Sequence, residues 1–236
     1  MAKKIMFLSG RGGTGKTTVC AEVGKRLAQM GKKTLIEEAD FGFGCLDLIL
    51  DIKNETIFDL KDALLYPENA ETAICKCEEN LDLIKPPYDS DFKVCKEQIL
   101  KLNDYLDDKY DFILIDTGGR YANIYQPLCE TADMILLFTE PDTVCIRSCE
   151  KAAEIIRNFS NAETGLIINK VKSGGKNDFE NFDEIIDKIG FKIIGILPYY
   201  ENSLKGVTHK NRRLWKKSIN NLCLRLNNFN ICLAIM

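Results

Sequence analysis

Residues 9–17 read S-G-R-G-G-T-G-K-T, and this stretch decides how the rest of the chain is interpreted. Gly10 and the triplet Gly15-Lys16-Thr17 stand at the spacing of a phosphate-binding loop. Such a loop requires glycines, because a residue without a Cβ lets backbone N–H groups close on phosphate oxygens. Lys16 is then expected to reach the β- and γ-phosphates of a nucleotide, and the Thr17 hydroxyl to ligate Mg²⁺.

The residues on either side of this loop favour the same interpretation. Residues 4–9 form a short apolar run typical of a buried strand, and residues 16–30 have the pattern of a helix. A strand, a glycine loop and a helix N-terminus in that order create an anion site from the helix dipole and unpaired N–H groups. The alternative is a glycine-rich turn without a ligand, and the flanking strand and helix argue against it.

The composition indicates one globular domain. With 236 residues, 45% of them hydrophobic, the chain has enough apolar material for one large core, so we expect a single domain over residues 1–236. Ten cysteines are scattered through the expected helices and strands, and the first strand follows the N-terminus without a secretory signal. We therefore expect a reduced, cytoplasmic protein with free, mostly buried thiols. No apolar run approaches the roughly 18 residues of a membrane span.

Charge is distributed unevenly along the chain. The formal net charge is −3, but residues 202–236 contain seven Lys or Arg and no Asp or Glu, so the preceding residues carry −10. An acidic body with a basic C-terminal segment is a pattern that attracts anionic membranes or nucleic acids.

Apolar runs alternate with helical patterns. Strands are expected at residues 4–9, 33–38, 81–85, 112–116, 134–138, 165–169 and 192–197. Helices are expected at residues 16–30, 46–50, 57–65, 91–105, 143–159 and 179–189. Because the strands are continuous apolar runs, we expect an α/β fold with a mostly parallel central sheet of about seven strands and helices on both faces. Ligands of such sheets bind at the carboxyl ends of strands, where Gly10, Asp40, Asp116 and Asn169 all lie.

Two aspartates at strand ends are candidates for metal and water chemistry. Asp116 closes the strand F-I-L-I-D, at the position of an acidic residue that holds Mg²⁺ through a water. The following D-x-x-G turn, with Gly118 and Gly119, would place a backbone N–H at the γ-phosphate. Asp40 is the candidate that orients or polarises the attacking water. The alternative for both aspartates is a structural role as a cap or turn residue.

The stretch I-N-K-V-K at residues 168–172 bears on which base is bound. It begins like the N-K-x-D element of GTP-binding domains, but the fourth position is Lys172, which offers no acceptor to guanine. Adenine therefore fits better, with the Asn169 amide meeting its exocyclic amine and N7. A strand-end turn is the alternative role of Asn169.

The ordered series of motifs resembles the MinD/ParA group of deviant Walker A ATPases, most of all its MinD branch. The resemblance rests on S-G-R-G-G-T-G-K-T-T, K-K-T-L-I-E-E-A-D-F-G-F-G-C-L-D-L-I-L, E-N-L-D-L-I, Y-D-F-I-L-I-D-T-G-G, D-M-I-L-L-F-T-E-P and I-I-G-I-L-P, and it covers about residues 2–200. It implies a P-loop NTPase fold, bound ATP and Mg²⁺, and an ATP-dependent homodimer that hydrolyses ATP slowly and engages an activator protein. The implied task is spatial regulation, such as division-site, flagellar or DNA positioning.

The resemblance also assigns roles to single residues. Arg11 replaces a lysine that crosses the dimer interface to the partner's nucleotide, and it keeps the charge in a planar fork. Glu38 stands where the family commonly has an Asp near the metal, and Pro198 at a position that borders the adenine. The implied nucleotide-binding residues are Gly10, Arg11, Gly12, Gly13, Thr14, Gly15, Lys16, Thr17, Thr18, Asn169 and Pro198. The implied metal ligands are Thr17, Asp40 and Asp116, and the implied catalytic residues are Lys16, Asp40 and Arg11.

The C-terminal segment, residues 202–236, contains a basic amphipathic helical pattern. Its apolar positions are Trp215, Ile219, Leu222, Leu226, Phe229, Leu233 and Met236. In the MinD branch such a helix grips the membrane on dimerisation, whereas the alternative is a final helix whose apolar stripe packs on the sheet. Peripheral contact with the inner face of the cell membrane is therefore one open alternative, and DNA is a less favoured partner.

Cysteine pairs leave further hypotheses open. Cys75 with Cys77, and Cys145 with Cys149, are spaced to hold a metal or cluster, as in metallochaperone or redox ATPases, although structural thiols are the favoured interpretation. A third hypothesis is an ATP-locked scaffold that hardly turns over, because Arg11 and Glu38 depart from the family pattern. His209, the only histidine of the chain, is assigned no role.

Overall fold

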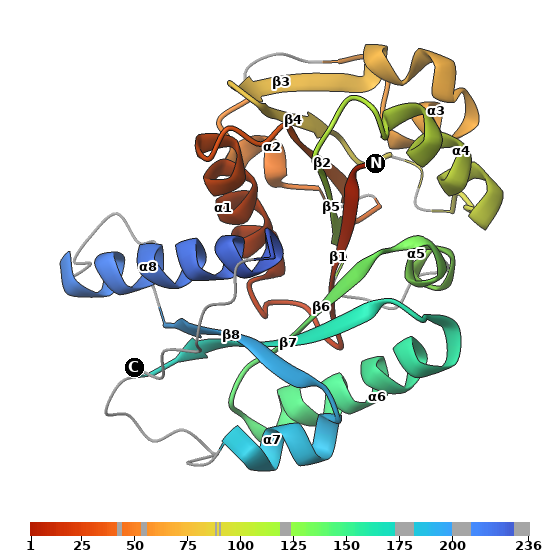
Figure 1. Ribbon diagram of the computed structural model, residues 1–236. Helices are drawn as coiled ribbons and strands as arrows, with labels where there is room; N and C mark the ends of the chain where they lie inside the picture. Colours follow the sequence, from red (N-terminus) through yellow and green to blue (C-terminus); the bar gives the residue numbers. More distant parts are fainter. Residues whose placement is uncertain are drawn as a thin grey trace.

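A computed structural model describes residues 1–41, 44–52, 56–87, 89, 91–118, 124–172, 182–199 and 209–228. Its centre is an eight-stranded sheet in the order β3-β4-β2-β5-β1-β6-β7-β8 (Figure 1). The strands are β1 Lys3–Ser9, β2 Thr34–Ala39, β3 Ile74–Glu78, β4 Leu81–Ile84, β5 Phe112–Thr117, β6 Met134–Thr139, β7 Glu163–Val171 and β8 Lys192–Pro198. The helices are α1 Lys16–Gln29, α2 Leu46–Ile49, α3 Leu60–Leu65, the 3-10 helix η1 Pro67–Ala73, α4 Lys96–Leu106, α5 Tyr125–Thr131, α6 Thr143–Phe159, α7 Phe182–Ile189 and α8 His209–Leu226.

All seven expected strands are present, and they pair in parallel. Strands β2, β5 and β6 are buried at every position, which explains the apolar runs of β5 and β6, while β2 also buries Glu37 and Glu38. The eighth strand, β3, was not expected. It pairs antiparallel to β4 at the sheet edge, and its exposed Lys76 and Glu78 alternate with more buried cysteines, so no apolar run marks it.

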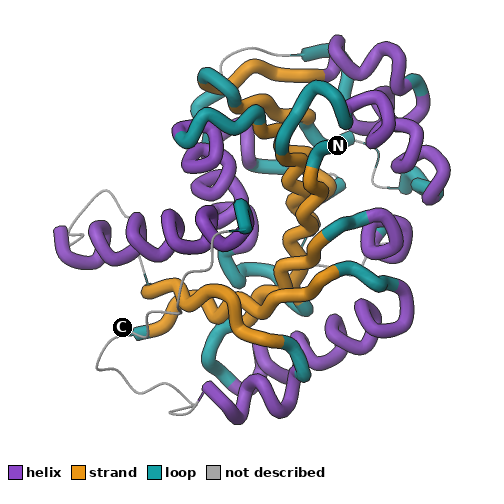
Figure 2. The backbone as a smooth tube through the Cα atoms, viewed as in Figure 1, coloured by secondary structure: helices purple, strands orange, loops and turns teal. Residues whose placement is uncertain are grey.

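Helices cover both faces of the sheet, on the left and right of the view in Figure 2. One core cluster joins α1, α2 and α8 to one face, and a second joins α3 to α7 to the other. The expected mostly parallel α/β architecture is therefore confirmed. Two helix starts differ from expectation: α3 begins at Leu60 because Asp59 caps it, and α4 begins at Lys96, where Gln98 accepts from the Cys95 N–H. Residues 179–181 of the expected helix before β8 lie outside the described residues.

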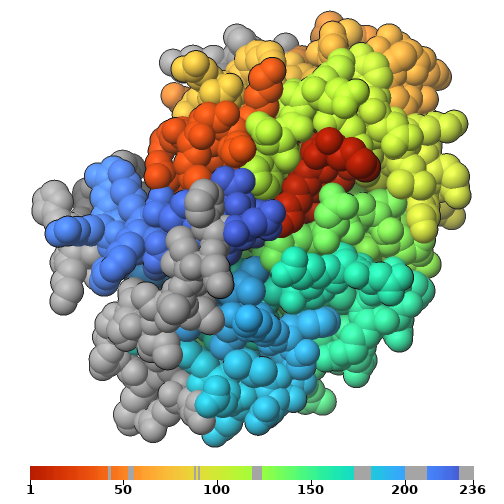
Figure 3. Space-filling model, viewed as in Figure 1, coloured from red at the N-terminus to blue at the C-terminus, as the bar shows by residue number. Residues whose placement is uncertain are grey.

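Helix α8 contains the described part of the apolar stripe that was expected either to pack on the sheet or to bind a membrane. Its apolar stripe is buried against α1 and β8, with Trp215, Ile219, Leu222, Cys223 and Leu226 each no more than 6% exposed. The described part of the stripe therefore packs on the core, and the apolar positions Phe229, Leu233 and Met236 lie outside the described residues. Figure 3 shows α8, in blue, on the surface of the molecule. Its Arg212, Arg213, Lys216 and Lys217 are exposed. None of the helices in the described ranges is long and apolar enough to cross a bilayer.

Strand register brings the candidate site together at the carboxyl edge of the sheet. Phe7 in β1 and Glu38 in β2 both pair with Asp116 in β5, so the ends of these three strands lie level. The loop after β1 and the loop after β2 therefore open onto the same edge as Asp116.

Candidate nucleotide-binding site

The loop between β1 and α1 has the backbone that its glycines predict. Gly13 and Gly15 have φ angles of 81° and 85°, in the left-handed region that favours glycine, and Gly15 caps the N-terminus of α1. Gly10 is required for another reason, since a Cβ there would overlap the backbone carbonyl of Ser148 in α6. The loop therefore curls tightly around the helix start and packs against α6.

Two residues near the carboxyl end of β7 hold the loop by its carbonyl groups. Asn169 Nδ2 donates to the Thr14 carbonyl at 2.7 Å, and Lys170 Nζ donates to the Gly13 carbonyl at 2.5 Å. Lys170 also pairs with Glu140 Oε1 at 2.8 Å and has a left-handed φ of 57°. These bonds occupy the carbonyl side of the loop and leave its N–H groups for the opposite side, where a phosphate would lie.

Asn169 therefore supports the phosphate loop. Its side chain is 2% exposed, and its Oδ1 accepts from the Lys170 N–H at 2.8 Å, so both amide atoms already have protein partners. A contact with adenine stays a prediction. Pro198 is buried at the end of β8, paired with Val171, and Tyr199 beside it is exposed with the Lys172 ammonium 5.7 Å from its ring.

Lys16 lies at the start of α1 and is 5% exposed. Burial lowers its pKa, while the charges of Asp116 and Asp40 raise it, so the two carboxylates and the ammonium belong to one electrostatic group. The other residues of the loop differ in how far they are exposed to solvent. Thr14 is buried, and no described residue hydrogen-bonds to its hydroxyl. Thr17 is half-buried, and Gly12 and Thr18 are exposed.

Asp116 is the most deeply buried acidic side chain of the site. Its side chain is 0% exposed, and within the part of the chain that the structure describes neither carboxylate oxygen has a hydrogen-bond partner. Burial raises the pKa of Asp116 to about 7, although the neighbouring Thr17 hydroxyl and Lys16 ammonium lower it. An orphaned carboxylate beside a threonine hydroxyl supplies hard oxygen donors, so these residues fit a hydrated divalent cation such as Mg²⁺.

Asp40 and Glu38 complete the acidic side of the site, and both raise the pKa of Asp116 by their charge. The Asp40 carboxylate lies against Gly118, where a Cβ would overlap it. Glu38 is 2% exposed, and its Oε1 accepts from the backbone N–H groups of Cys45 and Leu46 at 2.6 and 3.0 Å. Residues 42–43, which follow Asp40, and Gly119, from the turn expected to reach the γ-phosphate, lie outside the described residues.

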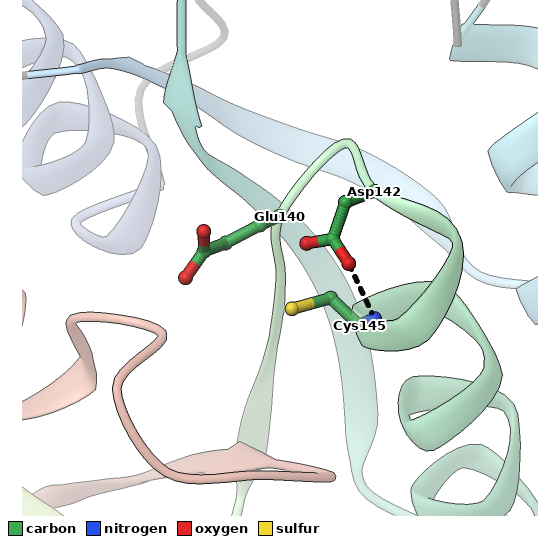
Figure 4. A group of neighbouring side chains, drawn as sticks. All are labelled: Glu140, Asp142 and Cys145. Atoms are coloured by element: carbon green, nitrogen blue, oxygen red, sulfur yellow. Dashed lines mark hydrogen bonds between the residues drawn. The ribbon is translucent and has the colours of Figure 1, made fainter. Parts of the chain in front are cut away.

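Arg11 lies exposed at the tip of the loop, near the start of α6. Burial raises the pKa of Asp142, but hydrogen bonds from Cys145 and Val144 and the charge of Arg11 outweigh this and lower it. Figure 4 shows Asp142 with Glu140 and Cys145, whose ligand atoms lie within 4.8 Å of one another. This group does not suit a metal ion well, because Lys170 already neutralises Glu140 and the Cys145 thiol has its pKa raised to about 12 by burial and by Asp142.

The cysteines that the structure describes are free thiols. Cys75 is 2% exposed, Cys77 has its pKa raised to about 12, first by burial, and the nine cysteines of the described residues are all free thiols. Within the described ranges, the three possible ligand side chains that lie together are Glu140, Asp142 and Cys145, and neither Cys75 nor Cys77 belongs to such a group of three. A raised pKa makes the Cys77 thiol a poor ligand and a poor nucleophile, and Cys75 is buried, so structural thiols stay the favoured interpretation.

The sheet, the glycine loop and the oxygen donors at its edge define a P-loop nucleotide-binding protein. Residues 5–211 match the family described as the CobQ/CobB/MinD/ParA nucleotide binding domain. The chain belongs to this family, as its motifs indicated.

Curated relatives and solved structures agree with this assignment. The septum site-determining protein MinD of Synechocystis sp. is 28% identical over 84% of this chain and 76% of its own length, and that of Bacillus subtilis is 26% identical over 89% and 81%. The MinC:MinD cell division protein complex of Aquifex aeolicus matches with a TM-score of 0.84 and 26% identity over 99% of each chain. MinD of Pyrococcus horikoshii, complexed with Mg-ADP, shares the fold with a TM-score of 0.75 and 24% identity over 96% of each chain.

Proposed function

We propose that this protein is a MinD-like ATPase that binds Mg·ATP, hydrolyses it slowly and uses the bound nucleotide as a dimerisation switch in spatial regulation. The observation that carries the proposal is the Asp116 carboxylate next to Thr17 and Lys16 of the glycine loop. It is buried and has no hydrogen-bond partner among the described residues. Relatives named septum site-determining protein MinD support division-site placement as the process.

Each residue of the site has a distinct task in this proposal. Thr17 and Asp116 hold the metal, directly and through water, and bound Mg²⁺ would neutralise charge on the phosphates. Lys16 contacts the β- and γ-phosphates, and the loop N–H groups bind their oxygens. Asp40 lies next to Gly118 at the same edge, so it is placed to orient a water towards the γ-phosphate.

Arg11 is proposed to act across the dimer. Its exposure at the loop tip leaves it accessible to a second subunit, and its planar fork suits phosphate oxygens. Arg11→Ala should spare nucleotide affinity of the monomer, measured by calorimetry, while weakening ATP-dependent dimerisation in sedimentation velocity. Equal dimerisation of the variant and the wild type would refute the trans role.

The partners in this proposal are a second copy of the chain and an activator protein. The Aquifex MinD relative forms a complex with MinC, which supports a protein partner of this kind. A peripheral contact with an anionic membrane, or less favourably with DNA, would use the exposed cations of α8, which are Arg212, Arg213, Lys216 and Lys217. The buried apolar stripe of α8 leaves charge as the main attraction there.

The deciding experiment compares wild type with Asp116→Asn. Calorimetry with ATP should show Mg²⁺-dependent binding to the wild type, and the variant should lose most of the Mg²⁺ dependence while keeping the fold. Absence of nucleotide binding by the wild type would overturn the proposal. Phosphate release, measured with and without lipid vesicles and DNA, separates a regulated ATPase from an ATP-locked scaffold, which neither surface would stimulate.

A further inference from the structure

Helices α1 and α8 pack against each other (Figure 1), and a groove of about 390 Å³ opens between them. Its lining residues recur every three or four positions along each helix, which is the spacing of a single helix face. From α1 they are Glu22, Lys25, Arg26 and Gln29, and from α8 they are Arg212, Lys216, Ile219 and Asn220. The fold therefore joins two distant segments of the sequence into one concave surface.

The groove is basic, although the chain as a whole is acidic. Its lining holds four cations against one carboxylate, which leaves an excess of three positive charges, whereas the formal net charge of the chain is −3. Within the described ranges, none of Arg26, Arg212 and Lys216 takes part in an ion pair, and the same holds for the one acid, Glu22. Like charges gathered in a concavity repel one another and focus a positive potential there. An anion in the groove would relieve this repulsion.

Arg26 is held in the groove by a hydrogen bond between the two helices. Its side chain is half-buried, and its Nε donates to Asn220 Oδ1 at 2.8 Å. No described residue accepts a hydrogen bond from its terminal nitrogens, Nη1 and Nη2. A guanidinium presents these N–H groups in a planar fork that matches the oxygens of a phosphate. Because Asn220 restrains the side chain, Arg26 loses less conformational freedom on binding than an unrestrained surface arginine would.

We propose that the groove between α1 and α8 is a second anion site that binds a phosphate monoester or inorganic phosphate, with Arg26 as its anchor. A phosphate monoester carries a charge of about −1.5 to −2 near pH 7, which suits the excess of three positive charges better than a single carboxylate does. The phosphate can belong to a soluble molecule or to the headgroup of a lipid. None of the glycine-loop residues lines the groove, so the site does not require a bound nucleotide.

Calorimetric titration of the full-length protein with inorganic phosphate tests the site, at constant ionic strength and with saturating Mg·ADP to occupy the glycine loop. Two charge-matched double variants of α8 are compared. Arg212→Gln with Lys216→Gln, the groove pair, removes two cations of the lining. Arg213→Gln with Lys217→Gln, the outer pair, removes two exposed cations of the same helix outside the lining.

Both pairs change the net charge equally at exposed positions, so the fold should tolerate them. The groove pair should weaken phosphate binding by about tenfold or more, and the outer pair by less than about twofold. All variants keep the glycine loop unchanged, so any phosphate bound there would contribute equally to each titration.

Asn220→Ala tests Arg26 without any change of charge. It removes the acceptor of the Arg26 Nε–H, so phosphate affinity should fall about threefold to tenfold as the guanidinium gains freedom. Asn221→Ala, at the adjacent half-buried position outside the lining, is the control and should keep the affinity of the wild type. Equal affinities of the two alanine variants would overturn the assignment of Arg26 as the anchor.

Vesicle co-sedimentation separates the two sources of the phosphate. Vesicles of phosphatidylcholine with phosphatidic acid, whose headgroup is a phosphate monoester, are compared with phosphatidylcholine alone. Binding of free phosphate that the groove pair weakens more than the outer pair supports a soluble ligand. The same difference on phosphatidic acid vesicles alone supports a lipid headgroup. Equal losses from the two pairs, or no binding by the wild type in either assay, would overturn the proposal.

Discussion

Glu37→Gln is expected to stabilise the protein, and to do so more at alkaline than at acidic pH. Glu37 lies in β2, next to Glu38 in sequence, and it is 4% exposed; its Oε1 has no hydrogen-bond partner among the residues that the structure describes. Burial raises the pKa of Glu37 from its usual 4.5 to about 7, and the charge of Lys4 lowers it only in part. Lys4 offers limited help because its ammonium is already paired with Asp107.

The magnitude follows from the two pKa values. A raised pKa means that the wild type has its full stability from Glu37 below about 4.5 and loses it as the pH rises through about 7. At about 1.36 kcal/mol per pH unit, burying the ionised side chain costs about 3.4 kcal/mol at pH 8.5 and about 2.0 kcal/mol at pH 6.0. Neutral glutamine removes this cost, so its stabilising effect should be about 1.4 kcal/mol larger at pH 8.5.

Urea unfolding at the two pH values measures the difference, with the fluorescence of Trp215, the only tryptophan, as the probe. Glu79→Gln is the control, because Glu79 is exposed and its substitution should change the free energy of unfolding little at either pH. An equal effect of Glu37→Gln at pH 6.0 and pH 8.5 would refute the argument that Glu37 is buried as a nearly neutral acid.

Three other substitutions test the packing of the site and the core. Gly10→Ala would drive a Cβ into the Ser148 carbonyl, so it should reduce nucleotide affinity in calorimetry by more than about tenfold and cost about 1–3 kcal/mol of stability. Lys170→Met should weaken nucleotide binding about tenfold by releasing a phosphate-loop carbonyl, whereas Lys61→Met, which removes a more exposed ion pair, should leave binding unchanged. Leu222→Ala, at a fully buried position of α8, should lower the free energy of unfolding by about 2–5 kcal/mol in urea titrations.

Much of the fold can be predicted from the sequence because the sheet is buried on both faces. A strand such as β6 is apolar at nearly every position, so its run stands out without any knowledge of its neighbours. Strand β3 could not be predicted from an apolar run, because it lies at the edge of the sheet, where Lys76 and Glu78 face solvent. The α8 stripe left two alternatives, of which packing on the sheet was favoured, since an apolar helix face has the same pattern whether it packs on a core or on lipid.

Some residues of the site can be predicted from short sequence patterns, whereas others are brought to the site only by the fold. The glycine loop and Asp116 are predicted by short patterns, because their chemistry needs certain residue types at a fixed spacing. The support that Asn169 gives the loop comes from a residue 155 positions away from Thr14, and Glu140 reaches the loop only through Lys170. Such partners depend on strand order, which no short pattern encodes.

The covering of α1 by α8 has a consequence for synthesis of the chain. Helix α1 is among the first elements to be made, yet the helix packed on it is the last described one, and the two are joined by the Cys223 thiol donating to the Val23 carbonyl. Lys3 in β1 likewise donates to the carbonyl of Leu226. During translation the apolar surface that receives α8 therefore stays uncovered until nearly the whole domain has left the ribosome. A nascent chain stalled before residue 209 would expose this surface, and such chains should be the ones that aggregate or recruit chaperones.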